Sequence, residues 1–319
     1  MPAWWRLRAG LRAAASLNRF ARRPASRPLI GAAAIVPCGL LLSTGHVFCR
    51  PLAQKSESPA LQGARGIAIV TGGSRGIGAA ISKVLAAEGY AVAVNFRGSE
   101  AAAEEVVTAI RKAGGVARRV YADMAVEEDI VKMFDEIQSF WPDLPLSALV
   151  NNAGINKSSK MQADDSLGSS FQTLKCVNKE AFHDMLDVNV FGALIASREF
   201  AMRASAGSIV NISSGSAVIG TGIYGMTKAA MNALQAWLVK ELTPRGIRVN
   251  TVSPGLTRSD MIAEFLEKKP DLSFIPMNRA GEPSEIAEVV AFLVSEKASY
   301  VSGANIRVAG GRPPGTFIG

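Results

Sequence analysis

The chain has 319 residues, of which 48% are hydrophobic and 19% are charged, and it contains 30 glycines. This composition is typical of a globular α/β protein and excludes an intrinsically disordered one. Three cysteines and two histidines are too few for a disulfide scaffold, a zinc site or a serine–histidine triad, so no metal site is expected. The net charge of +8 would by itself suggest a nucleic-acid or anionic-membrane partner.

This positive charge is concentrated at the N-terminus. Nine basic residues and no acidic residue lie in residues 1–56, which leaves 26 basic against 27 acidic residues in the rest of the chain. We therefore expect no nucleic-acid partner. Residues 1–28 are rich in Arg, Ala and Ser, which is typical of an organelle transit peptide. A mitochondrial location is expected first, with the plastid as the alternative.

An uncharged, mostly apolar stretch follows at residues 29–48. It is long enough to cross a bilayer, which takes about 20 residues, but Gly31, Pro37 and Gly39 interrupt it. A cleaved leader is favoured over a retained anchor, and a membrane partner is expected only if the segment is retained. Residues 1–64 are therefore interpreted as a targeting leader and linker, and residues 65–319 as one domain.

Apolar, strand-like segments alternate with amphipathic helical patterns from residue 65 onward. The strands are expected at residues 66–70, 91–96, 117–121, 148–150, 208–212, 248–252 and 305–308. The helices are expected at residues 76–88, 100–113, 127–140, 179–204, 224–242 and 282–296. This alternation predicts an α/β fold: a single Rossmann-type doubly wound domain with a seven-stranded parallel sheet and helices on both faces.

Two long polar stretches, residues 156–180 and 259–283, interrupt the alternation. Both follow predicted strands, and ligands of open α/β sheets bind outside the carboxyl ends of the strands. Either stretch could therefore border a site, although a solvated insertion without a role is favoured for the first.

The first strand leads into a glycine-rich turn at residues 71–78, and a helix follows. The spacing G-x-x-x-G-x-G places glycines at 72, 76 and 78. Such glycines allow a tight turn and let backbone N–H groups approach a pyrophosphate at the helix N-terminus. The turn predicts a dinucleotide site.

The second strand ends in Asn95, Phe96 and Arg97, without the carboxylate that would accept a hydrogen bond from the ribose 2′-hydroxyl of NAD. Arg97 and Arg75 instead offer guanidinium groups, which match a phosphate. We therefore predict NADP(H) as the cofactor. Asp123 could accept from the adenine amino group, and residues 151–154 (Asn-Asn-Ala-Gly) would bring backbone close to the cofactor.

Tyr224 and Lys228 form the strongest chemical signal. Their i, i+4 spacing places both on one side of a helix. A nearby ammonium lowers the pKa of a tyrosine from its ordinary value of about 10. The pair would therefore supply an acid–base group without histidine.

These motifs, together with Asn189, Ser214 and residues 253–255 (Ser-Pro-Gly), occur in the order seen in the short-chain dehydrogenase/reductase family. Residues 275–283, 299–303 and 309–311 also resemble that family, so that the similarity covers about residues 65–311. The chain is most similar to the classical NADP-preferring group, which contains 3-oxoacyl-[acyl-carrier-protein] reductases and sugar or carbonyl reductases.

The resemblance implies a role for each catalytic residue. Tyr224 would donate its proton to the carbonyl oxygen as hydride arrives from the nicotinamide, and Ser214 would hydrogen-bond that oxygen. Lys228 would hold the nicotinamide ribose and lower the pKa of Tyr224, and Asn189 would fix a water in a proton relay to Lys228. The expected cofactor-binding residues are Gly72, Ser74, Arg75, Gly76, Ile77, Gly78, Asn95, Arg97, Asp123, Met124, Asn151, Ala153, Gly154, Tyr224, Lys228, Pro254 and Gly255.

Two departures from the family pattern leave alternatives open. Ser214 precedes Tyr224 by only ten residues, fewer than is usual, so Ser213 or Ser216 could supply the hydroxyl. The stretch through residues 156–180 is longer than usual.

The expected function is an NADPH-dependent 3-oxoacyl-[acyl-carrier-protein] reductase of organellar fatty-acid synthesis. Basic residues near the active site would then bind the acidic carrier protein electrostatically. The candidates are Arg198, Arg203, Lys268 and Lys269. The alternatives are a reductase or dehydrogenase of sugars or small carbonyls, and a catalytically impaired NADPH-binding protein. By analogy with the family, a homotetramer or homodimer is expected.

Overall fold

The computed structural model describes residues 63–157 and 177–314. The apolar segment 29–48, and the predicted leader and linker as far as residue 62, lie outside these residues. So does most of the first polar stretch, residues 158–176. Within the described ranges no helix is both long and apolar enough to cross a membrane.

Seven strands form one sheet in the described part of the chain, and every neighbouring pair is parallel. The order across the sheet is β3-β2-β1-β4-β5-β6-β7. The predicted seven-stranded Rossmann-type fold is therefore confirmed. The strands are β1 (Ile67–Val70), β2 (Ala91–Phe96), β3 (Val116–Tyr121), β4 (Leu146–Asn151), β5 (Gly207–Ile212), β6 (Ile247–Pro254) and β7 (Asn305–Val308).

Burial along the strands follows their place in the sheet. β1 and β2 are buried along their whole length, as expected for parallel strands covered on both faces. β3 lies at the edge and exposes Arg118 and Arg119, and charged side chains discourage pairing with another chain. β6 continues two residues beyond its predicted end because Ser253 and Pro254 pair with β7.

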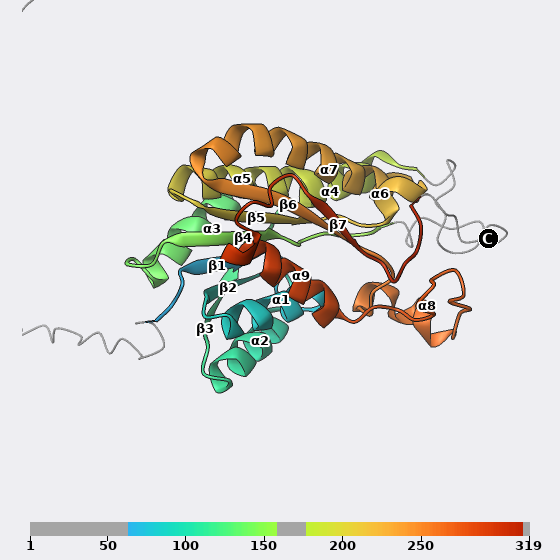
Figure 1. Cartoon of the computed structure of the whole chain (residues 1–319), viewed down its shortest axis with the longest axis horizontal. Coiled ribbons are helices and arrows are strands. Elements are labelled where there is room, and N and C mark those ends of the chain that lie inside the picture. Colours follow the sequence, from blue (N-terminus) through green and yellow to red (C-terminus); the bar gives the residue numbers. More distant parts are fainter. Residues whose placement is uncertain (1–62, 158–176, 315–319) are drawn as a thin grey trace, which may run out of the picture. The chain divides into compact units, whose positions relative to one another are not determined.

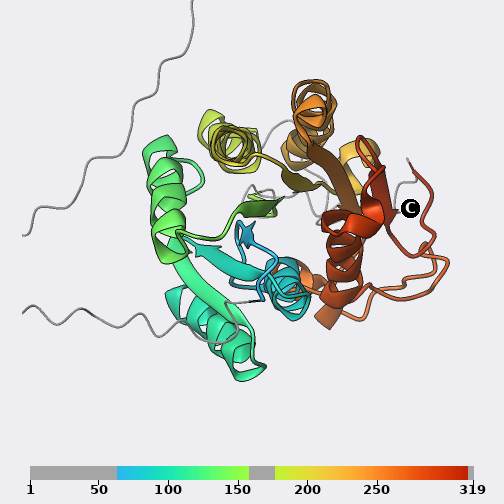
Figure 2. The ribbon, with the colours of Figure 1, turned by 60° about the vertical axis from the view of Figure 1, so that its left-hand side comes forward.

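Helices cover both faces of the sheet (Figures 1 and 2). Residues of α3, α5 and α7 share one buried cluster with the sheet, and residues of α1, α2 and α9 share the other. The bounds are α1 (Gly76–Ala87), α2 (Glu100–Lys112), α3 (Glu127–Phe140), α4 (Lys179–Leu186), α5 (Gly192–Arg203), α6 (Ser216–Ile219), α7 (Gly222–Leu242), α8 (Ala263–Glu267) and α9 (Pro283–Val294).

The segment predicted as a helix at residues 179–204 is helical without a gap from residue 179 to 203, but it is not α-helical throughout. A π-helical turn, η4 (Asp187–Phe191), separates α4 from α5. Such turns often occur at functional sites, and η4 contains Asn189, whose side chain is bonded to the backbone of Ile155. Gly192 follows the turn where the helix meets Met124, and a Cβ at Gly192 would lie 2.2 Å from the Met124 carbonyl oxygen.

The helix with Tyr224 begins two residues earlier than predicted, at Gly222. The short interval after Ser214 is not an irregular loop, because it contains the single-turn helix α6. The order of connections reverses between β1 and β4, and ligands of open α/β sheets bind at such a switch point. The loops after these two strands hold the glycine-rich turn and residues 151–154.

Candidate active site

The glycine-rich turn has the conformation that its spacing predicted. Gly72 and Gly76 have φ values of +61° and +52°, which residues with a Cβ adopt rarely. Gly78 is needed for a different reason, because a Cβ there would lie 2.2 Å from the carbonyl oxygen of Gly72. The turn can therefore fold tightly and lead into α1, whose N-terminus favours an anion.

Asn152 and Thr71 hold this turn, and neither was among the predicted site residues. Asn152 Nδ2 donates to the carbonyl oxygens of Thr71 and Gly72 at 2.9 and 3.0 Å. Thr71 Oγ1 accepts the backbone N–H groups of Asn152 and Ala153, both at 3.0 Å. The loop after β4 is thus fastened to the loop after β1. The sequence feature that could have indicated Asn152 is the pair of asparagines at 151 and 152. Neighbouring residues at the end of a strand point to opposite faces of the sheet, so the pair places one amide side chain on each face.

Three predicted cofactor-binding residues turn their side chains into the protein. Asn95 is buried, and its Oδ1 accepts the N–H of Gly72 at 3.0 Å. Asn151 Nδ2 donates to Asn211 Oδ1 at 2.9 Å, and Met124 is part of the buried core. Their side chains support the loops rather than line the space outside the sheet. Their place among the cofactor-binding residues stays a prediction, which their backbone atoms would have to fulfil.

The two arginines predicted to face a phosphate are each paired with a carboxylate. Arg97 Nη1 lies 3.3 Å from an oxygen of Asp123, the residue expected to contact adenine. Arg75 Nη1 lies 3.3 Å from Asp260 Oδ2, which belongs to the second polar stretch. Both guanidinium groups remain more than half exposed, so an incoming anion can reach them.

Ser74, Ile77 and Ala153 lie partly exposed around the glycine-rich turn. Pro254 is the last residue of β6, and Gly255 follows it at the same edge of the sheet. The carbonyl oxygen of Pro254 accepts the N–H of Gly215 at 2.9 Å, which connects the end of β6 to the loop that follows β5.

Lys228 is 4% exposed. Its Nζ donates to the carbonyl oxygen of Ile212 at 2.9 Å and lies 5.7 Å from the centre of the Tyr224 ring. A Cβ at Gly154 would lie 3.3 Å from this Nζ and 3.4 Å from Asn189 Oδ1. Glycine at 154 therefore leaves a small space that Lys228 and Asn189 both border.

Burial shifts the pKa of both members of the Tyr224–Lys228 pair. It raises the pKa of Tyr224 to about 12, and a hydrogen bond with Ser214 opposes this shift. It lowers the pKa of Lys228 to about 8. In this structure desolvation raises the pKa of the phenol, and the lowering of the Tyr224 pKa by Lys228 in the working enzyme stays a prediction.

Ser214, and not Ser213, contacts Tyr224. Ser214 is hydrogen-bonded to the phenol, and its Oγ also accepts the N–H of Ser216 at 3.1 Å. Ser213 is buried and donates to the carbonyl oxygen of Lys228 at 2.9 Å. The geometry favours Ser214 over the two alternatives, since Ser213 faces the helix backbone and Ser216 begins α6.

The Asn189 side chain is bonded on two sides. Its Oδ1 accepts the N–H of Ile155 at 2.8 Å, while Nδ2 donates to the Ile155 carbonyl oxygen and to Thr227 Oγ1, both at 3.0 Å. Thr227, which was not predicted, thereby connects η4 to α7. The amide fixes the position of the loop after β4 next to Lys228, and a water-holding role for it stays a prediction.

Three of the four basic residues considered for an acidic partner are also paired with carboxylates. Arg198 bonds Glu127 and Glu199, and Arg203 bonds Asp135 and Glu199. Lys268 lies 3.3 Å from Glu264. These charges are therefore largely balanced by carboxylates.

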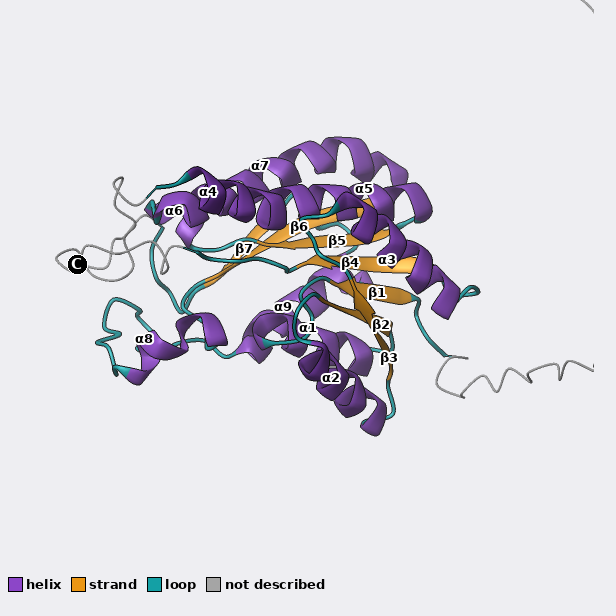
Figure 3. Cartoon of the chain, turned by 180° about the vertical axis from the view of Figure 1, so that it is seen from behind, coloured by secondary structure: helices purple, strands orange, loops and turns teal. Residues whose placement is uncertain are grey.

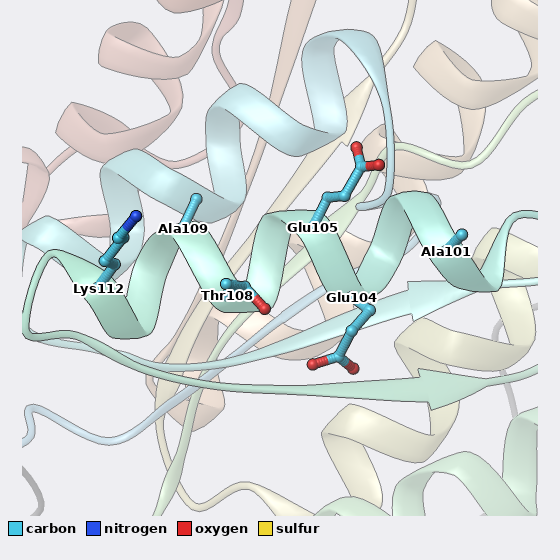
Figure 4. Close-up of a pocket in the computed structure, with 6 residues that line it drawn as sticks. All are labelled: Ala101, Glu104, Glu105, Thr108, Ala109 and Lys112. Atoms are coloured by element: carbon cyan, nitrogen blue, oxygen red, sulfur yellow. The ribbon is translucent and has the colours of Figure 1, made fainter.

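A shallow hollow on the surface of α2 does not belong to this site (Figure 4). All of its lining residues come from that helix, namely Ala101, Glu104, Glu105, Thr108, Ala109 and Lys112. Among the described residues no group of three or more Cys, His, Asp or Glu side chains is placed to hold a metal ion.

Comparisons with known proteins identify the family to which the chain belongs. Residues 72–312 match the family model described as enoyl-(acyl carrier protein) reductase. An uncharacterized oxidoreductase of Escherichia coli, YgfF, is 40% identical over 77% of this chain and 99% of its own length. The 3-oxoacyl-[acyl-carrier-protein] reductase FabG of Staphylococcus aureus is 37% identical over 76% of this chain and 96% of its own.

The chain belongs to the short-chain dehydrogenase/reductase family. The resemblance seen in the motifs is thus confirmed. Among solved structures, a short-chain dehydrogenase of Burkholderia cenocepacia in complex with NADP superposes with a TM-score of 0.68 and 32% identity. That comparison covers 79% of this chain and 99% of the other.

Proposed function

We propose that this short-chain dehydrogenase/reductase is an NADPH-dependent carbonyl reductase that acts on 3-oxoacyl thioesters. The observation that carries the proposal is the convergence of Ser214, Tyr224 and Lys228 beside Gly154, next to the glycine-rich turn. The NADP complex of the Burkholderia relative supports the cofactor, and FabG supports the class of substrate.

The residues present fit a dinucleotide. The left-handed glycines 72 and 76 and the space that a side chain at Gly154 would fill form a cradle along the end of the sheet. Arg75 and Arg97 would bind the 2′-phosphate, Asp123 the adenine and Lys228 the nicotinamide ribose. NADPH, when bound, supplies the hydride that reduces the carbonyl carbon.

Tyr224 would act as the general acid. Its phenol keeps its proton at neutral pH, but the raised pKa makes it a weaker acid than an ordinary tyrosine. Proton transfer from Oη therefore depends on the negative charge that develops on the carbonyl oxygen as the hydride arrives. Ser214, which bonds the same phenol, would hydrogen-bond that oxygen and stabilise its developing charge. The carbonyl carbon gains a hydride and the oxygen a proton, so that an alcohol forms and Tyr224 is left to be reprotonated.

Carrier-protein recognition is a separate question from the reduction itself. The ion pairs of Arg198 and Arg203 with Glu127, Glu199 and Asp135 reduce the free positive charge that an acidic carrier protein would meet. This observation favours a second candidate function, reduction of sugars or other small carbonyl compounds without a carrier.

The full chain with NADPH should be tested on acetoacetyl groups attached to acyl-carrier protein, to coenzyme A and to a small thiol, and on sugars. Turnover of the thioesters supports the first proposal, and turnover of sugars alone supports the second. Tyr224→Phe should lower turnover by about 10²–10⁴-fold and keep NADPH binding, since it removes only the proton donor. NADPH binding without any turnover would instead support a catalytically impaired protein.

We also propose a mitochondrial location, with the plastid as the alternative. The support is the leader composition, in which residues 1–56 contain nine basic residues and no acidic one. A fluorescent fusion of the full chain should enter mitochondria, and deletion of residues 1–56 should abolish entry. Recovery in a carbonate-resistant membrane fraction would indicate that residues 29–48 remain as an anchor.

The homotetramer or homodimer proposed by analogy can be checked by light scattering.

A further inference from the structure

The second polar stretch begins directly beside the glycine-rich turn. Asp260 opens the 3₁₀ turn η6 (Asp260–Ile262), and its Oδ2 lies 3.3 Å from Arg75 Nη1. A Cβ on Gly76 would lie 3.5 Å from the Cβ of Ser259. Two parts of the chain separated by 185 residues therefore meet at the N-terminus of α1.

The backbone contacts at the two ends of this polar stretch, residues 259–283, fix the position of Asp260. Thr257 and Gly281 form a parallel bridge. The N–H of Arg258 donates to the carbonyl oxygen of Gly281 at 2.9 Å, and its guanidinium lies 2.7 Å from Glu282. The two ends of the stretch are thus joined, and Asp260 follows the join. Figure 3 shows the stretch, with α8, on the side of the molecule that α1 and α9 occupy.

Asp260 and the cofactor phosphate would need the same guanidinium. Carboxylate and phosphate bind arginine in similar ways, and the two anions repel each other at short range. Both partners of the Arg75–Asp260 pair are exposed, at 62% and 71% of their side-chain surface. Exposed pairs contribute little stability, so a phosphate can displace the carboxylate at a small cost.

The other arginine does not leave the site positively charged. Arg97 is paired with Asp123, so these two pairs together are neutral before the cofactor binds. Asp123 has a further hydrogen bond to the N–H of Ala125 and an expected contact with adenine. Asp260 has no such second role in the predicted cofactor site, so its effect can be measured separately.

We propose that Asp260 is a specificity-determining residue for the cofactor: it competes with the 2′-phosphate for Arg75 and so weakens NADPH binding relative to NADH binding. This inference rests on the proposed phosphate role of Arg75. It implies that the preference for NADPH is smaller than two unpaired arginines would produce.

The test is fluorescence titration of the full chain with NADPH and NADH at low salt. Asp260→Asn should tighten NADPH binding by about two- to fivefold, the range expected for an exposed ion pair. NADH binding should not change, because NADH lacks the phosphate. Glu264→Gln is the matched control, since it removes one exposed charge from α8 of the same stretch, and it should change neither affinity.

A double-mutant cycle separates direct competition from a general charge effect. Arg75→Gln should weaken NADPH binding, and Asp260→Asn should have no further effect on NADPH in that background. Equal tightening of both cofactors, or persistence of the effect without Arg75, would overturn the competition. So would unchanged NADPH binding in Asp260→Asn while Arg75→Gln weakens it, which leaves the proposed function standing. If Arg75→Gln itself leaves NADPH binding unchanged, the phosphate role of Arg75 is wrong.

Discussion

The burial of Lys228 makes the stability of the protein depend on pH. Its pKa is about 8 in the folded chain, against an ordinary value of 10.5. Between these values the unfolded chain binds the proton more tightly, so the free energy of unfolding rises as the pH rises. With about 1.36 kcal/mol for each pKa unit, ionised Lys228 costs about 3 kcal/mol at pH 7, and most of this cost is relieved by pH 10.

Lys228→Met removes the titrating group and keeps an unbranched apolar side chain. Urea unfolding at pH 7 and pH 10 should show that the free energy of unfolding of the wild type rises by about 2–3 kcal/mol more than that of this variant over the interval. Loss of the bond to the Ile212 carbonyl changes the variant equally at both pH values and cancels in the comparison. Lys240→Met, which alters an exposed lysine of the same helix, should keep the wild-type dependence. Equal pH dependence in the wild type and Lys228→Met would refute the reasoning.

Four further substitutions test how the site is built. Gly78→Ala should abolish cofactor binding and cost about 1–3 kcal/mol of stability, measured by titration and unfolding, because its Cβ would meet the Gly72 carbonyl oxygen at 2.2 Å. Asn152→Ala should cost about 1–3 kcal/mol and weaken cofactor binding, since two carbonyl oxygens lose their donor; unchanged affinity would contradict its supporting role. Ser214→Ala should lower kcat by about 10²-fold. Ser213→Ala should chiefly lower stability, by about 1 kcal/mol, and the reverse pattern would exchange the two roles.

The sequence was sufficient to predict the strands because their apolar runs are local and continuous. It also predicted the glycine-rich turn, because each glycine there meets a local requirement. Gly72 and Gly76 adopt a left-handed φ, and Gly78 lies too close to the backbone for a side chain. The i, i+4 spacing of Tyr224 and Lys228 placed both on one face of α7, as the short distance between ring and ammonium shows.

Contacts between distant segments were not predictable in the same way. Asn95 and Asn151 resemble cofactor ligands in the sequence, yet their amides are used to support neighbouring loops. The amide of Asn189 in the π-helical turn bonds the backbone of Ile155, which lies 34 residues earlier. No local sequence pattern predicts a hydrogen bond between such distant residues.

By itself, the sequence determined the parallel α/β architecture, the dinucleotide-binding turn and the family, because each follows from periodicity or from motifs of short range. Only the tertiary structure decided which serine meets Tyr224, in which direction burial shifts the pKa of Tyr224 and Lys228, and that Asp260 pairs with Arg75. Desolvation and ion pairing depend on which groups packing brings together, and residues far apart in the chain supply those groups.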